Sequence, residues 1–152
     1  MHKDSNPCGL DGFAFLEFSG PDKKRLHKQF SDMGFQIVAT HKDQDIALFQ
    51  QGTIQFIVNS VTNSQAETHA KTHGPGACAM GFRVHDAPAA YEYAIQHGAT
   101  PFEDCEHAHH HLPAIQAIGG SVIYFVDDKH QPFGLTNWQK HTPSANIGNG
   151  LI

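Results

Sequence analysis

Residues 104–113 contain the densest group of metal-binding side chains in this sequence. The run reads DCEHAHHHLP and places four histidines, one cysteine and two acids within its first eight residues. Each of these residue types can ligate zinc, iron or nickel. In an extended backbone alternate side chains share one side, so His107, His109 and His111 would point the same way. The run therefore raises the question of a metal centre.

The place of this run in the chain argues against a functional metal site. It lies between two predicted strands, whereas a functional site needs a rigid frame and hydrogen-bond partners behind its ligands. We expect residues 107–111 to form a solvent-exposed connection. Two alternatives stay open, namely chance chelation of Ni²⁺ or Zn²⁺ by two of the histidines, and a built metal site.

Other reactive side chains are scattered along the sequence. His69 and His73 are four residues apart on a predicted helix, but no glutamate follows His69, so the H-E-x-x-H pattern of metalloproteases is absent. We expect both on a solvated helix face. Glu17 lies among phenylalanines in a predicted strand, where we expect it to pair with Arg83; a lone buried acid with a raised pKa is the alternative. The sequence has neither a Ser/His/Asp signature nor a glycine-rich phosphate loop.

The composition is typical of one folded domain. The chain has 152 residues, of which 39% are hydrophobic and 16% charged. Its formal net charge of −5, without any basic block, argues against nucleic-acid binding. The sequence also lacks a signal peptide and the roughly 20-residue apolar stretch of a membrane span. Cys8, Cys78 and Cys105 are widely spaced, which indicates reduced thiols in a cytoplasmic protein.

The predicted elements occur twice in the same order. A strand, a helix and three strands are predicted over residues 10–60, and the same order over 77–128, including a strand over 99–105. The intervening residues 63–76 begin with a short predicted helix and end in Gly-Pro-Gly. This duplication predicts an α+β fold of two βαβββ modules with pseudo-twofold symmetry, eight strands and outer helices. An unrelated α+β domain with accidental symmetry is the alternative.

The domain boundary is predicted near residue 138. We interpret residues 1–138 as one domain and 139–152 as a linker, because this tail contains Asn, Gly and Pro and lacks periodicity. The chain nevertheless ends in the apolar pair Leu151-Ile152, as if a strand were beginning. We therefore expect the natural chain to continue into a further, C-terminal domain.

Four stretches of the sequence, in this order and at this spacing, carry a resemblance to a known family. The chain resembles the N-terminal domain of the 4-hydroxyphenylpyruvate dioxygenase family, in the vicinal-oxygen-chelate (glyoxalase-like) superfamily. None of the stretches is a catalytic motif, and together they extend over about residues 6–128. They are NPCGLDGFAFLEFSGP, MGFQIVATHKDQDIALFQQGTIQFIVN, HGPGACAMGFRVHDAPAAYEYAIQHGA and LPAIQAIGGSVIYFVDD.

The resemblance implies an Fe(II)-dependent enzyme that converts 4-hydroxyphenylpyruvate and O₂ to homogentisate and CO₂ in tyrosine and phenylalanine catabolism. In that family two histidines and a carboxylate of the C-terminal domain hold the iron. The corresponding positions of the N-terminal fold are about Gly12, Met80 and Tyr124 in this sequence, which cannot supply such a set. The resemblance thus implies no catalytic, cofactor-binding or metal-binding residue in this chain. It implies a filled apolar core instead, and an inactive chain when residues 1–152 stand alone.

The resemblance also implies the partners of the chain. These are its own C-terminal catalytic domain and further copies of the full-length protein in a homo-oligomer, with neither nucleic acid nor membrane. Two alternatives stay open. One is a stand-alone degenerate module that binds a small ligand in the cleft between the repeats. The other is the N-terminal half of a 4-hydroxymandelate synthase, since product choice depends on residues of the catalytic domain.

Overall fold

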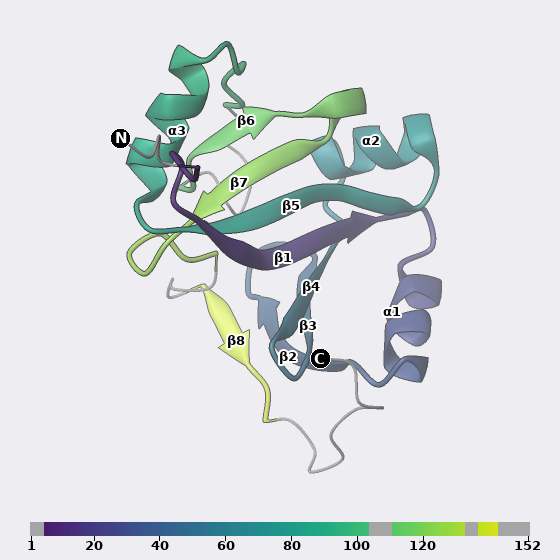
Figure 1. The fold of residues 1–152 in the computed structure, drawn as a ribbon. Coiled ribbons are helices and arrows are strands. Elements are labelled where there is room, and N and C mark those ends of the chain that lie inside the picture. Colours follow the sequence, from purple (N-terminus) through teal and green to yellow (C-terminus); the bar gives the residue numbers. More distant parts are fainter. Residues whose placement is uncertain (1–4, 104–110, 133–136, 143–152) are drawn as a thin grey trace.

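A mixed sheet of eight strands organises the chain (Figure 1), which the computed structural model describes over residues 5–103, 111–132 and 137–142. The strand order across the sheet is β6-β7-β5-β1-β4-β3-β2-β8. The strands are β1 (Leu10–Ser19), β2 (Gln36–His41), β3 (Ile46–Gln51), β4 (Ile54–Asn59), β5 (Gly76–Val84), β6 (Ala114–Gln116), β7 (Val122–Val126) and β8 (Trp138–Lys140).

The sheet consists of two modules with the same connections. In the first module β1 runs parallel to β4, and β4 is antiparallel to β3. In the second module β5 runs parallel to β7, and β7 is antiparallel to β6. The modules meet at the centre of the sheet, where β1 pairs antiparallel with β5. The predicted α+β fold built from a repeated unit is confirmed.

One helix of each module begins at an aspartate that caps it. α1 (Lys23–Asp32) follows Asp22 and α3 (Ala87–Gln96) follows Asp86, and each carboxylate accepts a hydrogen bond from the backbone N–H three residues on. Such caps satisfy a backbone donor that has no partner within the helix. Each helix follows the first strand of its module, in the predicted order.

These two helices pack on the same face of the sheet, which we call the outer face. Leu26 and Phe30 of α1 pack on apolar side chains of the first module. Ala87 and Ala90 of α3 pack in the same way on Val84 and Phe125 of the second module. Each helix covers its own module, and Figure 1 shows them at opposite ends of the central strands.

A third helix connects the modules. α2 (Gln65–His73) begins at Ser64, whose hydroxyl oxygen accepts a hydrogen bond from the backbone N–H of Glu67 at 3.1 Å. Its buried residues Ala66 and Ala70 are small, which lets the helix lie close to β5 and β1. The short helix predicted in this connection is confirmed.

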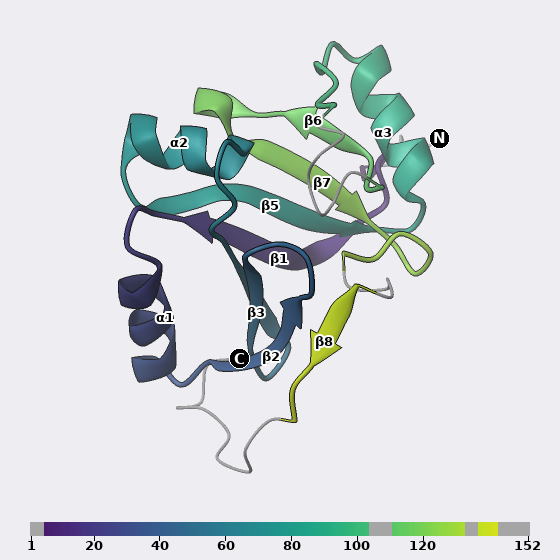
Figure 2. The ribbon, with the colours of Figure 1, turned by 180° about the vertical axis from the view of Figure 1, so that it is seen from behind.

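The opposite, inner face of the sheet carries the largest apolar cluster, which we call the inner core. It draws on both modules and on β8, and it fills the concave side of the sheet, which we call the hollow. Figure 2 shows the curved sheet from behind. The buried members of the inner core are Phe15, Ala39, Ile46, Leu48, Ile57, Ala79, Leu112, Ala114, Val122, Tyr124, Val126 and Trp138.

Two predicted elements differ from the structure. The strand predicted over residues 99–105 is reduced, in its described part, to one bridge between Pro101 and Ile115. On either side of this bridge the backbone N–H of Phe102 donates to Ala114 at 3.0 Å and that of Gln116 donates to Thr100 at 2.8 Å. The linker predicted from residue 139 was wrong at its start, because Trp138–Lys140 form β8 along the edge of β2. Trp138 is buried in the inner core, which anchors this strand.

Candidate functional site

Gly12, Met80 and Tyr124 do not converge on a common site. Gly12 lies on the exposed part of β1 with a φ of 90°. Tyr124 is 2% exposed in the inner core, where its ring centroid lies 5.9 Å from that of Phe15. Met80 is paired with Ile123, whose side chain packs under α3. Met80 and Tyr124 therefore lie on opposite faces of the sheet.

The hollow of the sheet is filled by protein side chains. Gly81 of β5 faces Phe15, and a Cβ atom added to Gly81 would lie 2.5 Å from Cε1 of that ring. Real Cβ atoms do not approach other atoms so closely, so the ring occupies the space that a side chain at residue 81 would take. This part of the inner face cannot admit a ligand without movement of Phe15.

Buried polar groups lie next to this apolar filling. Glu17 and Asn59 are both 0% exposed, and Nδ2 of Asn59 donates to Oε1 of Glu17 at 3.0 Å. Sγ of Cys78 lies 3.5 Å from the carbonyl oxygen of Glu17. Burial, and then the carboxylate of Glu17, raise the pKa of the Cys78 thiol far above its usual range. Cys78 is therefore a structural thiol, because nucleophilic attack requires the thiolate.

The predicted pair of Glu17 with Arg83 is wrong. The register places Glu17 opposite Ala79, four residues away from Arg83 along β5. Arg83 is exposed, and its Nη2 donates to the carbonyl oxygen of Phe13 at 3.3 Å. The guanidinium thus braces the exposed half of β1, while the carboxylate is held by Asn59 inside the fold.

His69 and His73 lie side by side on α2, with ring centroids 4.5 Å apart. Nε2 of His73 donates to the carbonyl oxygen of Gly119 at 2.7 Å, in the short 3₁₀ turn η1 (Ile118–Gly120). Burial, and then the neighbouring His73, lower the pKa of His69. His73 thus connects α2 to the second module, a role beyond the solvated face that we expected.

Most of the histidine run lies outside the described residues, so the expected exposed connection stays a prediction. Of its histidines, His111 is described, and its Nε2 donates to the carbonyl oxygen of Gln131 at 2.8 Å. In the described part of the chain, no group of three or more His, Cys, Asp or Glu side chains is placed to hold a metal ion.

Asp127 follows β7 and is the most strongly bonded carboxylate that the structure describes. It accepts hydrogen bonds from the backbone N–H of Ala87 at 2.7 Å, and from the backbone and ring nitrogens of His130 at 2.7 and 2.8 Å. Burial acts to raise its pKa, but these bonds outweigh burial and lower the pKa of Asp127 to about 2. The residue joins the start of α3 to the end of β7.

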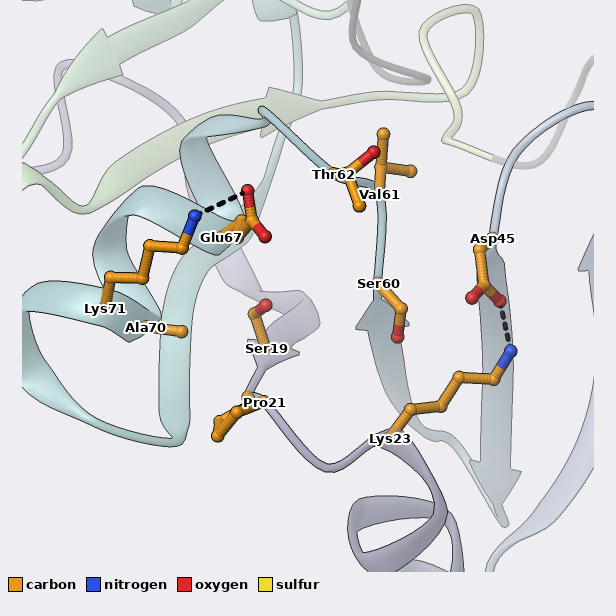
Figure 3. A pocket seen from close by; sticks show the side chains of 11 residues that line it. Ser19, Pro21, Lys23, Asp45, Ser60, Val61, Thr62, Glu67, Ala70 and Lys71 are labelled. Carbon is orange, nitrogen blue, oxygen red and sulfur yellow. Dashed lines mark hydrogen bonds and ion pairs between the residues drawn. The ribbon is translucent and has the colours of Figure 1, made fainter.

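A pocket with a volume of about 510 Å³ opens beyond the carboxyl ends of the parallel strands β1 and β4. Loops at such strand ends are common places for ligand sites. The floor and walls come from the turn after β1, the turn after β4, the start of α1 and one side of α2 (Figure 3). The lining residues are Ser19, Gly20, Pro21, Lys23, Asp45, Ser60, Val61, Thr62, Glu67, Ala70 and Lys71.

Charged groups at the mouth of this pocket are already paired with each other. Lys23 forms an ion pair with Asp45, and Nζ of Lys71 lies 3.1 Å from Oε2 of Glu67 (Figure 3). The backbone N–H of Asn63, and then the ammonium of Lys71, lower the pKa of Glu67. The pocket can offer hydrogen bonds and balanced charge, but the described residues that line it include neither histidine nor cysteine for acid–base or nucleophilic catalysis.

Comparison with known proteins decides the family of the chain. The family described as "Hydroxyphenylpyruvate dioxygenase, HPPD, N-terminal" matches residues 4–135. The chain belongs to this family. A 4-hydroxyphenylpyruvate dioxygenase of Legionella pneumophila is 66% identical over 149 residues, which cover 98% of this chain and 42% of that protein. The chain therefore spans less than half the length of this relative.

Solved structures agree with this family membership. A xylose isomerase-like TIM barrel/4-hydroxyphenylpyruvate dioxygenase fusion protein superposes with a TM-score of 0.79 and 28% identity, covering 89% of this chain and 22% of that one. A mutant of 4-hydroxymandelate synthase from Streptomyces coelicolor gives a TM-score of 0.68 at 15% identity, covering 82% of this chain and 40% of that one. The second similarity concerns the fold alone.

The Fe(II) ion that the dioxygenase family implies does not fit the residues that the structure describes at the three corresponding positions. Glycine has no donor atom at residue 12, and Met80 points away from Tyr124 across the sheet. The hollow between the modules is filled by Phe15 and its neighbours.

Among the described residues, no helix is long and apolar enough to cross a membrane.

Proposed function

We propose that this chain is the metal-free N-terminal domain of an Fe(II)-dependent dioxygenase that converts 4-hydroxyphenylpyruvate and O₂ to homogentisate and CO₂. The observation that carries the proposal is 66% identity, over 98% of this chain, to a 4-hydroxyphenylpyruvate dioxygenase. In the full-length protein the iron is bound by a C-terminal domain, and the reaction belongs to tyrosine and phenylalanine catabolism.

The work of this domain is to brace the catalytic domain. Its hollow is packed with apolar side chains from both modules, and its buried acid, Glu17, is held by Asn59 within the fold. Such an arrangement favours rigidity, because a close-packed core transmits strain and resists deformation. The domain accordingly contributes no catalytic, cofactor-binding or metal-binding residue.

The proposal extends to location and assembly. We propose a cytoplasmic protein, which is supported by the free cysteines Cys8 and Cys78. We also propose that the full-length protein forms a homo-oligomer. Cell fractionation would test the location, and light scattering on the purified full-length protein would measure its mass.

Turnover by the full-length gene product tests the proposed function. Incubated with Fe(II), ascorbate, O₂ and 4-hydroxyphenylpyruvate, it should take up one O₂ for each CO₂ released. Chromatography of the product should identify homogentisate. Formation of 4-hydroxymandelate instead would assign the chain to a synthase, and lack of any turnover by an iron-loaded, folded protein would contradict the proposal.

A second candidate function is a stand-alone module that binds a small ligand. The observation that favours it is the pocket of about 510 Å³ beside α2, with paired lysines and carboxylates at its mouth. A gene that stops at Ile152 would support this candidate. A gene that continues into a second domain, with dioxygenase turnover, would reject it.

A further inference from the structure

A strip of apolar side chains lies on the outer face at the centre of the sheet. Phe13 of β1 is 64% exposed, and its ring lies 5.1 Å from that of Phe82 on β5. Leu16 pairs with Met80 across the same two strands. We call these four residues the central strip. Leu10, which is 47% exposed, extends it toward the start of β1.

The pairing of β5 with β7 places the central strip on the outer face. Phe82 and Met80 are paired with Phe125 and Ile123, and both of these pack under α3. On the other side, Leu16 is paired with Phe56, which packs under α1. The strip therefore lies between the two helix-covered clusters. Figure 1 shows no helix of the described residues crossing β1 or β5 on this side.

The outer-face positions at the centre of β1 and β5 do not have the polar side chains that a solvent-exposed face normally has. A sheet with one solvated face normally alternates apolar and polar residues. Here the inner face takes Phe15 and Ala79, while the outer positions hold phenylalanine, leucine and methionine. Soluble proteins seldom leave contiguous apolar surface uncovered, and such surface commonly marks a contact with another protein surface. The central strip has the composition of a strand that is buried on both sides.

We propose that the C-terminal part of the full-length protein covers the central strip. This inference rests on the proposed function, because it requires the chain to continue. The chain covers 42% of the Legionella pneumophila relative, so more than half of that protein lies outside the aligned part. A tethered domain meets the strip at a high effective concentration, without any need for a second molecule. The covering surface is apolar, since the strip itself offers no charge.

Cysteine labelling of the full-length gene product tests this proposal. Phe13→Cys and Ile118→Cys would each be made in a Cys8→Ser/Cys105→Ser background, which leaves Cys78 buried. Ile118 is 94% exposed on the turn η1, away from the strip, and serves as the matched control. A maleimide should label the Phe13→Cys protein several-fold more slowly than the Ile118→Cys protein. Similar rates for the two variants would overturn the proposal.

Dilution separates the tethered domain from a second copy. Protection of Phe13→Cys should persist at concentrations where light scattering reports a monomer. Protection that is lost together with oligomers would overturn the proposal in favour of a self-association face. Turnover of 4-hydroxyphenylpyruvate is measured on the same samples, so that an active protein with an unprotected strip refutes this inference while leaving the proposed function intact.

A stability measurement provides a second, independent readout. In the full-length protein, Phe13→Ser should lower the midpoint of thermal unfolding or split it into two transitions, because the two domains would separate. Ile118→Ser should leave the unfolding profile unchanged. An unchanged profile for Phe13→Ser would count against the proposal even if the labelling result were favourable.

Discussion

The thiols of Cys8 and Cys78 differ in environment, and this difference gives a first prediction at the scale of residues. Cys78 is 0% exposed and its pKa is raised, first by burial and then by the carboxylate of Glu17. Cys8 is half-buried. In a Cys105→Ser variant, a thiol reagent should therefore titrate Cys8 in the native protein and Cys78 only after denaturation. Equal rates for both thiols in the folded protein would contradict this account.

Asp127 gives a prediction about stability and pH. Its folded-state pKa is lowered to about 2, so its contribution is present above the unfolded value near 3.8 and is lost as the pH falls toward 2. Asp127→Asn should reduce the free energy of unfolding at pH 7 by about 2 kcal/mol. The variant and the wild type should approach each other in stability near pH 2, as measured by urea denaturation.

The neighbouring Asp128 is the control for this prediction. It is exposed, so Asp128→Asn should change the unfolding free energy by no more than about 0.5 kcal/mol. A loss for Asp127→Asn that stayed constant from pH 7 to pH 2 would show that the carboxylate charge is not the cause.

Single residues also show where sequence reasoning failed. The sequence identified Glu17 as a candidate buried acid, but it could not give its partner. The pairing of β1 with β5 contains several register shifts, and each shift changes which side chains are opposite. Asn59, the partner found here, comes from β4 of the same module. Its position next to Glu17 depends on the parallel pairing of β1 with β4, which sequence periodicity does not reveal.

Among the secondary-structure elements, β1 and β5 pack so closely that adding one methyl group to β5 should destabilise the fold. Gly81→Ala would place a Cβ atom 2.5 Å from the ring of the buried Phe15. We expect a loss of about 1–3 kcal/mol in the free energy of unfolding, as for overpacked cores. Gly76→Ala in the same strand is the control, because nothing lies within 4 Å of its added Cβ atom. Equal effects of the two substitutions would argue against the filled hollow.

The helices and most strands were predictable because local signals set them. Aspartate caps begin α1 and α3, and apolar alternation marks the strands of the first module. The weaker elements depend on distant partners. β8 has no periodicity of its own and exists because Trp138 enters the inner core and the edge of β2 is open to it. The strand expected over residues 99–105 is, in its described part, a single bridge between Pro101 and Ile115.

At the scale of the whole molecule, the internal duplication predicted two related modules and the resemblance predicted the family. The pocket beside α2 was beyond sequence reasoning, because its lining comes from turns after β1 and β4 and from two helices. The central strip could not be predicted from the sequence for a similar reason. Phe13 and Phe82 look like ordinary core residues in sequence, and only the positions of α1 and α3 show that neither helix covers them.

The central claim is that this domain folds around a filled hollow and holds no iron, so that catalysis needs the rest of the protein. The most direct measurement compares residues 1–152 with the full-length gene product under excess Fe(II), ascorbate, O₂ and 4-hydroxyphenylpyruvate. We predict coupled O₂ uptake and CO₂ release by the full-length protein, and none by the 152-residue chain when circular dichroism shows it folded. Coupled O₂ uptake and CO₂ release by residues 1–152 alone would contradict the account.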